Sequence, residues 1–125
     1  MADITAVLTR LATRGDDNVR MVLWEAMGNA DTGVGVDGTG STVQIPGFAD
    51  RTAQVAGTFG GATVTVQGSN DGTNWATLRD PQGADLTFTV AGIKQVLEVT
   101  RHIRATTSGG AGTDVDVTLL LRRPA

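Results

Sequence analysis

The sequence predicts an all-β protein, an antiparallel β-sandwich with a jelly-roll-like arrangement, and two observations lead to this fold class. Threonine and glycine are abundant, whereas leucine, glutamate and lysine, the common helix formers, are few. Threonine's branched Cβ suits a pleated sheet, and glycine suits the turns between strands. Short segments of alternating apolar and polar residues also recur along the chain, separated by glycine-containing turns. Short, regularly spaced strands of this kind are typical of sandwiches and barrels.

The length of 125 residues corresponds to one domain with one hydrophobic core. We expect an N-terminal arm over residues 1–18 and a single β-sandwich domain over residues 19–125. The apolar residues of the arm fit a helical stripe, but the threonines between them are poor helix formers, which favours an extended conformation. A turn is predicted at Gly15–Asn18. The apolar residues of the arm are Ile4, Val7, Leu8 and Leu11.

The predicted strands follow the arm in series. The first, Val19–Met27, has apolar residues on both faces and should be buried on much of both. The segment Gly28–Thr42 is rich in glycine, aspartate and threonine and predicts a long loop, which is usually functional or mobile. The later strands are predicted over Thr52–Phe59, Ala62–Gly68, Trp75–Leu78, Asp85–Val90, Ile93–Val99, Arg101–Thr106 and Asp114–Leu121.

Alternation within these segments separates a core face from a polar face. The residues expected on the apolar faces are Ala62, Val64 and Val66, then Leu86, Phe88 and Val90, and finally Val115, Val117, Leu119 and Leu121. After the last strand, Arg122, Arg123 and Pro124 should stop further pairing and protect the sheet edge. The two arginines are also candidates for contact with an acidic partner.

Composition and charge argue against several classes of function. The chain has no cysteine, so disulfides, thiolate metal sites and catalytic cysteines are excluded. A net charge of -3 disfavours nucleic-acid binding, which requires clustered basic residues. No apolar run approaches the roughly 20 residues that span a bilayer, and the acidic start of the chain differs from a secretory signal. We therefore expect a soluble protein made in a cytoplasm, with no membrane partner.

Candidate catalytic and metal-binding residues are few. The single histidine, His102, lies in a predicted strand beside arginines, which favours a surface position over a general base. No serine lies in a nucleophile-elbow pattern, and the glycine clusters at 57–61 and 108–112 lack the context of a phosphate-binding loop. The aspartates could supply oxygen ligands to calcium, but no run matches a calcium loop. We expect no catalytic residue, no metal and no cofactor.

The hairpin Ala62–Leu78 carries the most specific local signal, the turn Ser69–Trp75. Asn70 and Asp71 can bond to their own backbone, Gly72 allows positive φ, and Trp75 restarts the next strand. The structural interpretation is that Trp75 packs over the hairpin while the polar residues close the turn. The functional alternative is that the exposed polar groups and the nearby aromatic ring bind a sugar or another protein.

This hairpin, Val64–Trp75, followed by His102-Ile103-Arg104, resembles elements of discoidin-like jelly rolls, which bind glycans or lipids. These motifs cover under half of the chain and are mainly structural in that family. Over residues 19–123, the order of motifs is more similar to small virion proteins encoded among the head genes of tailed bacteriophages. The elements are Trp24, Asp31-Thr32-Gly33, Val55–Gly60, the hairpin, Leu86–Thr89, Gly92-Ile93, Ile103-Arg104, Gly109-Gly110 and the terminal Arg122-Arg123.

The second resemblance implies a non-enzymatic capsid decoration, or cement, protein. Such a protein would bind the major capsid protein, stabilise the head and lie on the capsid surface of the virion as a homotrimer. The resemblance departs in the close spacing of residues 59–62 and in the N-terminal arm, which does not align. The residues expected to meet neighbours are Ile4, Val7, Leu8, Arg10, Leu11, Arg14, Asp31, Asp37, Arg122 and Arg123.

Two alternatives remain open from the sequence. One is a carbohydrate-binding β-sandwich module with a site near Asn74 and Trp75. Such a site needs an open aromatic face, so the exposure of Trp75 discriminates it from a hairpin anchor. The other is a different virion component, of the neck or tail.

Overall fold

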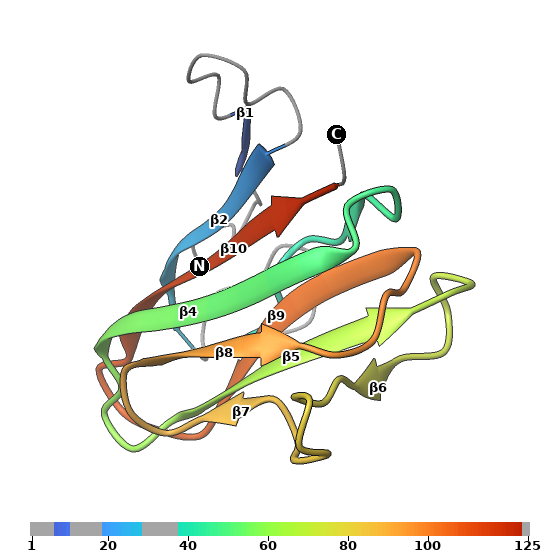
Figure 1. Cartoon of the computed structure of the whole chain (residues 1–125). Helices are drawn as coiled ribbons and strands as arrows, with labels where there is room; N and C mark the ends of the chain where they lie inside the picture. The colour runs from blue at the N-terminus through green and yellow to red at the C-terminus, as the bar shows by residue number, and fades with distance from the viewer. Residues whose placement is uncertain (1–6, 11–18, 29–37, 124–125) are drawn as a thin grey trace.

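The computed structural model describes residues 7–10, 19–28 and 38–123, and Figure 1 shows them as two layers of strands. Every helix or strand in the described part of the chain is a β-strand. The strands are β1 (Val7–Arg10), β2 (Val19–Met27), β3 (Val43–Gln44), β4 (Asp50–Thr58), β5 (Thr63–Ser69), β6 (Ala76–Thr77), β7 (Thr87–Phe88), β8 (Gly92–Val96), β9 (His102–Ser108) and β10 (Asp114–Arg122). The predicted all-β class is confirmed.

The strands form two antiparallel sheets. The first has the order β1-β2-β10-β4-β8, and the second has the order β3-β9-β5-β6, with β7 also pairing with β5. Because β2, β4, β8 and β10 lie in the first sheet and β3, β5, β7 and β9 in the second, the chain crosses repeatedly between layers. This winding gives the expected antiparallel sandwich. β10 is central in the first sheet and pairs along its length with β2 and β4.

The core lies between the sheets and follows the predicted alternation. In β10, Val115, Val117, Leu119 and Leu121 are all buried, as are Ala62 and the β5 residues Val64 and Val66. Trp24 on β2 is also fully buried, and its indole Nε1–H donates to the Ser41 carbonyl at 2.9 Å. That bond satisfies the one polar group of the largest core side chain.

The structure corrects several predicted boundaries. Within the predicted strand Asp85–Val90, only Thr87 and Phe88 form a strand, and Val90, expected on an apolar core face, is exposed. Trp75 lies just before β6 rather than within it. The short β3 was not predicted; it pairs with the start of β9. Two residues are too few for a sequence period to be recognised.

The long predicted loop at 28–42 ends against β9. Thr107 N–H donates to the Gly38 carbonyl at 2.7 Å, and Gly40 N–H donates to the Ala105 carbonyl at 2.8 Å. Gly38, Thr39 and Gly40 are all buried. Residues 38–40 therefore belong to the body of the sandwich, and residues 29–37 lie outside the described part.

The predicted N-terminal arm contributes a strand to the first sheet. Val7–Arg10 form β1 and pair antiparallel with β2, with Val7 opposite Leu23 and Arg10 opposite Arg20. These four residues are therefore extended and cover one edge of β2. The other residues of the predicted arm lie outside the described part of the chain.

Candidate functional site

The predicted turn after β5 is built around the Asp71 carboxylate. One carboxylate oxygen accepts hydrogen bonds from Thr73 N–H and Asn74 N–H, both at 2.8 Å, and from the Ser69 hydroxyl at 2.9 Å. The other accepts from the Asn74 side-chain amide at 2.7 Å. These bonds, led by the one from Asn74 N–H, hold the pKa of Asp71 far below its usual range. Gly72 has a φ of 78°, as the turn requires.

Trp75 follows this turn, but it does not belong to the core between the sheets. Its partly buried ring lies on the outer face of the second sheet, where the Arg104 guanidinium carbon is 4.0 Å from the ring centroid. His102 lies to one side, with ring centroids 6.4 Å apart. These ring contacts of Trp75 are therefore with side chains of β9, and one of its faces is occupied by arginine.

The residues predicted to meet neighbours are only partly within the described chain. Ile4, Leu11, Arg14, Asp31 and Asp37 lie outside it, while Val7, Leu8 and Arg10 are residues of β1. Arg122 and Arg123 lie at the end of β10, where Arg122 forms an exposed ion pair with Asp50 at 2.8 Å. An exposed pair of this kind contributes little to stability.

The end of the sandwich next to Arg123 gathers further arginines. Two of them lie over the Phe48 ring, with the Arg20 guanidinium 5.1 Å and the Arg123 guanidinium 5.2 Å from its centroid. Arg51 is buried beneath, and it donates to the carbonyls of Phe48, Ile45 and Thr100 at 2.8–3.3 Å. Burial lowers the pKa of Arg51, yet the three carbonyls retain it inside the fold. Through these hydrogen bonds, Arg51 holds the turn at Ile45–Phe48 and the segment at Thr100 together at this end of the sandwich.

Exposed apolar side chains lie on and next to β8, the edge strand of the first sheet opposite β1: Ile93 is within β8, Val90 precedes it, and Leu97 and Val99 follow it. The exposed fractions are 71% for Val90, 61% for Ile93, and 47% each for Leu97 and Val99. Small soluble domains rarely leave a run of large apolar residues exposed beside a free strand edge. We call Val90, Ile93, Gln95, Leu97 and Val99 the β8 edge surface. The sequence predicted a strand here, but alternation alone could not show that this strand lies at the edge of its sheet.

The backbone of β8 also has hydrogen-bonding groups that face outward. Leu97 N–H donates at 2.8 Å to the carbonyl of Arg79, which lies on the side away from β4. Because backbone groups alternate in direction along a regular strand, we infer that Ile93 and Gln95 also point their N–H and C=O groups away from β4. Apart from the sheet ladders, no hydrogen bond between described residues uses these groups. The outer edge of β8 can therefore accept another strand.

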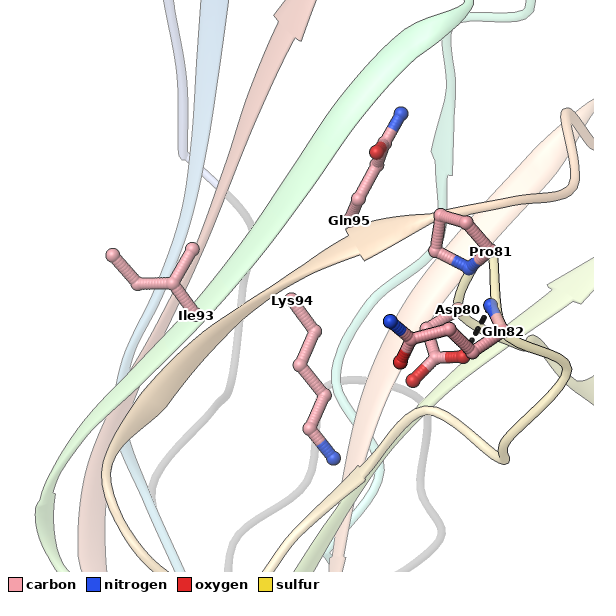
Figure 2. Close-up of a pocket in the computed structure, with 6 residues that line it drawn as sticks. All are labelled: Asp80, Pro81, Gln82, Ile93, Lys94 and Gln95. Atoms are coloured by element: carbon pink, nitrogen blue, oxygen red, sulfur yellow. Dashed lines mark hydrogen bonds between the residues drawn. The ribbon is translucent and has the colours of Figure 1, made fainter.

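A hollow of about 360 Å³ adjoins this edge and is lined by Ile93, Lys94 and Gln95 on one side and by Asp80–Gln82 on the other. Figure 2 shows Lys94 leaving β8 on the side opposite to Ile93 and Gln95. The Asp80 carboxylate accepts hydrogen bonds from Gln82 N–H and Ala84 N–H at 2.9 and 3.0 Å. These bonds close a tight turn, which forms the wall of the hollow that faces β8. Lys94 donates to the Thr87 carbonyl at 2.9 Å and bridges the two sheets.

A second hollow, of about 350 Å³, continues from Gln95 across the outer face of the first sheet. It is lined by Asp50, Thr52, Gln95, Leu120 and Arg122. Gln95 lines both hollows. The β8 edge surface therefore adjoins Arg122, one of the residues predicted to meet a partner.

Three remaining features of the described residues, 7–10, 19–28 and 38–123, bear on function: the grouping of metal-ligating side chains, the surroundings of the histidine and the length of any apolar helix. No three histidine, aspartate or glutamate side chains in these ranges are grouped to hold a metal ion. His102 lies on β9, partly buried beside Trp75 and Gly72. Within the same ranges, no helix is long and apolar enough to cross a membrane.

Comparison with known proteins provides no family assignment. No protein-family model matches the chain, and no curated protein matches it. Among solved structures, the chain is similar to the K1 cleaved adhesin domain of Lys-gingipain from Porphyromonas gingivalis W83. The identity is 11% and the TM-score is 0.40, over 96% of this chain and 94% of that one. A likeness of this degree carries no argument about function.

Proposed function

We propose that this protein is a non-enzymatic structural protein that attaches to a larger protein assembly through the β8 edge surface. The observation that carries the proposal is that Ile93, on the edge strand β8, and Leu97, just after its end, are both exposed, while the backbone groups of Ile93 and Gln95 make no hydrogen bond to a described residue outside the sheet ladders. Apolar side chains and unpaired strand groups together support addition of an extended segment from a partner. The hollow beside the strand leaves room for that segment.

The proposed setting is the head of a tailed bacteriophage, where the protein decorates the capsid. The support is the order of motifs over residues 19–123, which resembles small head proteins of such phages. In this setting the partner is the major capsid protein and the location is the outer surface of the virion. A closed homotrimer would present three copies of the β8 edge surface, and linked contacts raise the total affinity without any new interaction.

A pair of substitutions at Gln95 tests the docking mode. Gln95→Pro removes an outward N–H that β4 does not use, so the native sheet should tolerate it as edge strands tolerate proline. Gln95→Ala removes the side chain but keeps that N–H. In co-sedimentation with expanded capsids of the phage that encodes the protein, we expect Gln95→Pro to weaken binding about tenfold or more and Gln95→Ala to bind like the wild type.

The outcomes separate the two parts of the proposal. Equal capsid binding by both variants would show that β8 does not dock by strand addition. Failure of the wild type to bind capsids at micromolar concentration would count against the capsid setting itself. Electron microscopy of particles carrying a labelled copy then distinguishes decoration from a place in the neck or tail.

A further inference from the structure

The outer face of the second sheet carries an arginine held in one orientation by two neighbours. Arg104 on β9 lies opposite Gln67 on β5, and its Nε donates to the Gln67 side-chain oxygen at 2.9 Å. Its guanidinium also stacks on Trp75 at 4.0 Å. A guanidinium fixed on its Nε side and on one face keeps its two terminal nitrogens in a defined plane.

A second arginine lies near by on the same face. Arg101 precedes β9, and with the Gln44 amide oxygen turned toward it, Arg101 donates to that oxygen from Nε at 3.0 Å and from Nη2 at 3.3 Å. Gln44 is paired with His102, which shares the outward face with Arg104 two residues later. Both arginines thus take glutamine oxygens as partners, and no described ion pair joins either one to a carboxylate.

The terminal nitrogens of Arg104 are open to a ligand. They make no hydrogen bond to a described residue, and Arg104 is only partly buried. The nearby Asp71 carboxylate is engaged by four donors of its own turn region. The face therefore presents two positive charges, one of them preoriented, beside an ionised Asp71 whose oxygens are already occupied.

We propose that this face binds the carboxylates of an acidic segment of a protein partner, with Arg104 as the anchor. The two terminal nitrogens of Arg104 match the two oxygens of one carboxylate, and Arg101 offers a contact for a second. Trp75 and Gln67 are positioning residues, since they hold the guanidinium. Arg104 occupies one face of Trp75, and its two terminal nitrogens match the oxygens of a carboxylate better than the hydroxyls of a neutral sugar.

Fluorescence anisotropy with a labelled oligo-glutamate peptide at low salt tests this site. We expect Arg104→Gln to weaken binding about tenfold and Arg104→Lys, which keeps the charge but loses the planar fork, to fall between it and the wild type. Arg20→Gln is the matched control, because it changes the net charge equally on β2 in the other sheet, and it should change the affinity by less than about twofold. Near-ultraviolet circular dichroism confirms that each variant is folded.

Three results would overturn the proposal. These are oligo-glutamate binding that Arg104→Gln leaves unchanged, equal losses in Arg104→Gln and Arg20→Gln, or Arg104-dependent binding of a uronic-acid oligosaccharide that is tighter than peptide binding. The inference is independent of docking through β8. The Gln95→Pro variant should bind oligo-glutamate like the wild type, so failure at one surface is distinguishable from failure at the other.

Discussion

The Asp71 carboxylate shows how much of a turn one side chain can organise. Its hydrogen bonds hold its pKa well below the ordinary value in the folded protein, so the stabilisation that it provides is complete above about pH 4 and is lost as the pH falls through the folded pKa. We expect Asp71→Asn to lower the urea midpoint at neutral pH, because Asn cannot accept all four bonds. The difference from the wild type should shrink as the pH falls below 4.

Urea unfolding between neutral pH and pH 2 measures this effect. The amide resonances of Thr73 and Asn74 provide a second readout, since their shifts should titrate with a midpoint well below that of an unperturbed aspartate. A pH-independent difference between Asp71→Asn and the wild type would contradict the assignment of the stabilisation to the charged carboxylate.

Two glycines offer a matched pair for the packing around Trp24. A Cβ on Gly40 would lie 2.6 Å from Trp24 Cδ1 and 2.8 Å from its Nε1, so either the indole or the backbone must move. We expect Gly40→Ala to lower the free energy of unfolding by about 1–3 kcal/mol, as overpacking does. Gly47 has nothing within 4 Å of the same position, and Gly47→Ala should be neutral or slightly stabilising. Similar losses in both variants, in thermal or urea unfolding, would contradict this account.

Among the elements, β8 combines a free outer edge with an inward-directed lysine. Lys94 lies opposite the buried Ala53, and its ammonium donates to the Thr87 carbonyl while lying 5.1 Å from the Phe88 ring centroid. An inward-pointing charge is one means by which edge strands resist pairing with copies of themselves. We expect Lys94→Val to increase concentration-dependent self-association in sedimentation velocity, relative to the wild type. Unchanged association would show that Lys94 acts only as a bridge between the sheets.

The sequence predicted β5 and β10 well because their alternation is strict. β5 and β10 carry apolar residues at every second position, and these residues line the core. Short elements were harder, since β3, β6 and β7 contain two residues each and depend on neighbours for their pairing. Val90 continues the alternation of Leu86 and Phe88 but lies beyond the end of β7, where the chain has turned away from the core. Local pattern cannot report such a departure.

The candidate surfaces were less accessible to sequence reasoning than the fold. Asp71 and its turn were predicted because their bonds are local, whereas the stack of Arg104 on Trp75 joins residues 29 positions apart. The free edge of β8 depends on which strand ends each sheet, and that is a property of the topology. The burial of Arg51 likewise depends on carbonyls from two distant segments, Ile45 and Phe48 in one turn and Thr100, 49 positions from Arg51.

At the scale of the whole molecule, the four-residue strand β1 forms one edge of the first sheet and covers part of the nine-residue strand β2. Deleting residues 2–14 removes β1 and exposes the ladder groups of β2 that pair with it over Arg20–Leu23. We expect this truncation to lower the thermal midpoint by about 4 °C or more for each kcal/mol of lost pairing. It should also promote association through the new edge.

Deleting residues 2–6 provides the control for this truncation, because it retains Val7–Arg10 and therefore the pairing with β2. Its thermal midpoint and its sedimentation should match the wild type. Equal destabilisation by both truncations would show that β1 contributes nothing beyond the residues before it. The comparison also decides how loss of capsid binding is to be interpreted. A loss shared by both truncations points to a direct contact by residues 2–6. A loss confined to the longer one points to the altered sheet edge or to residues 7–14.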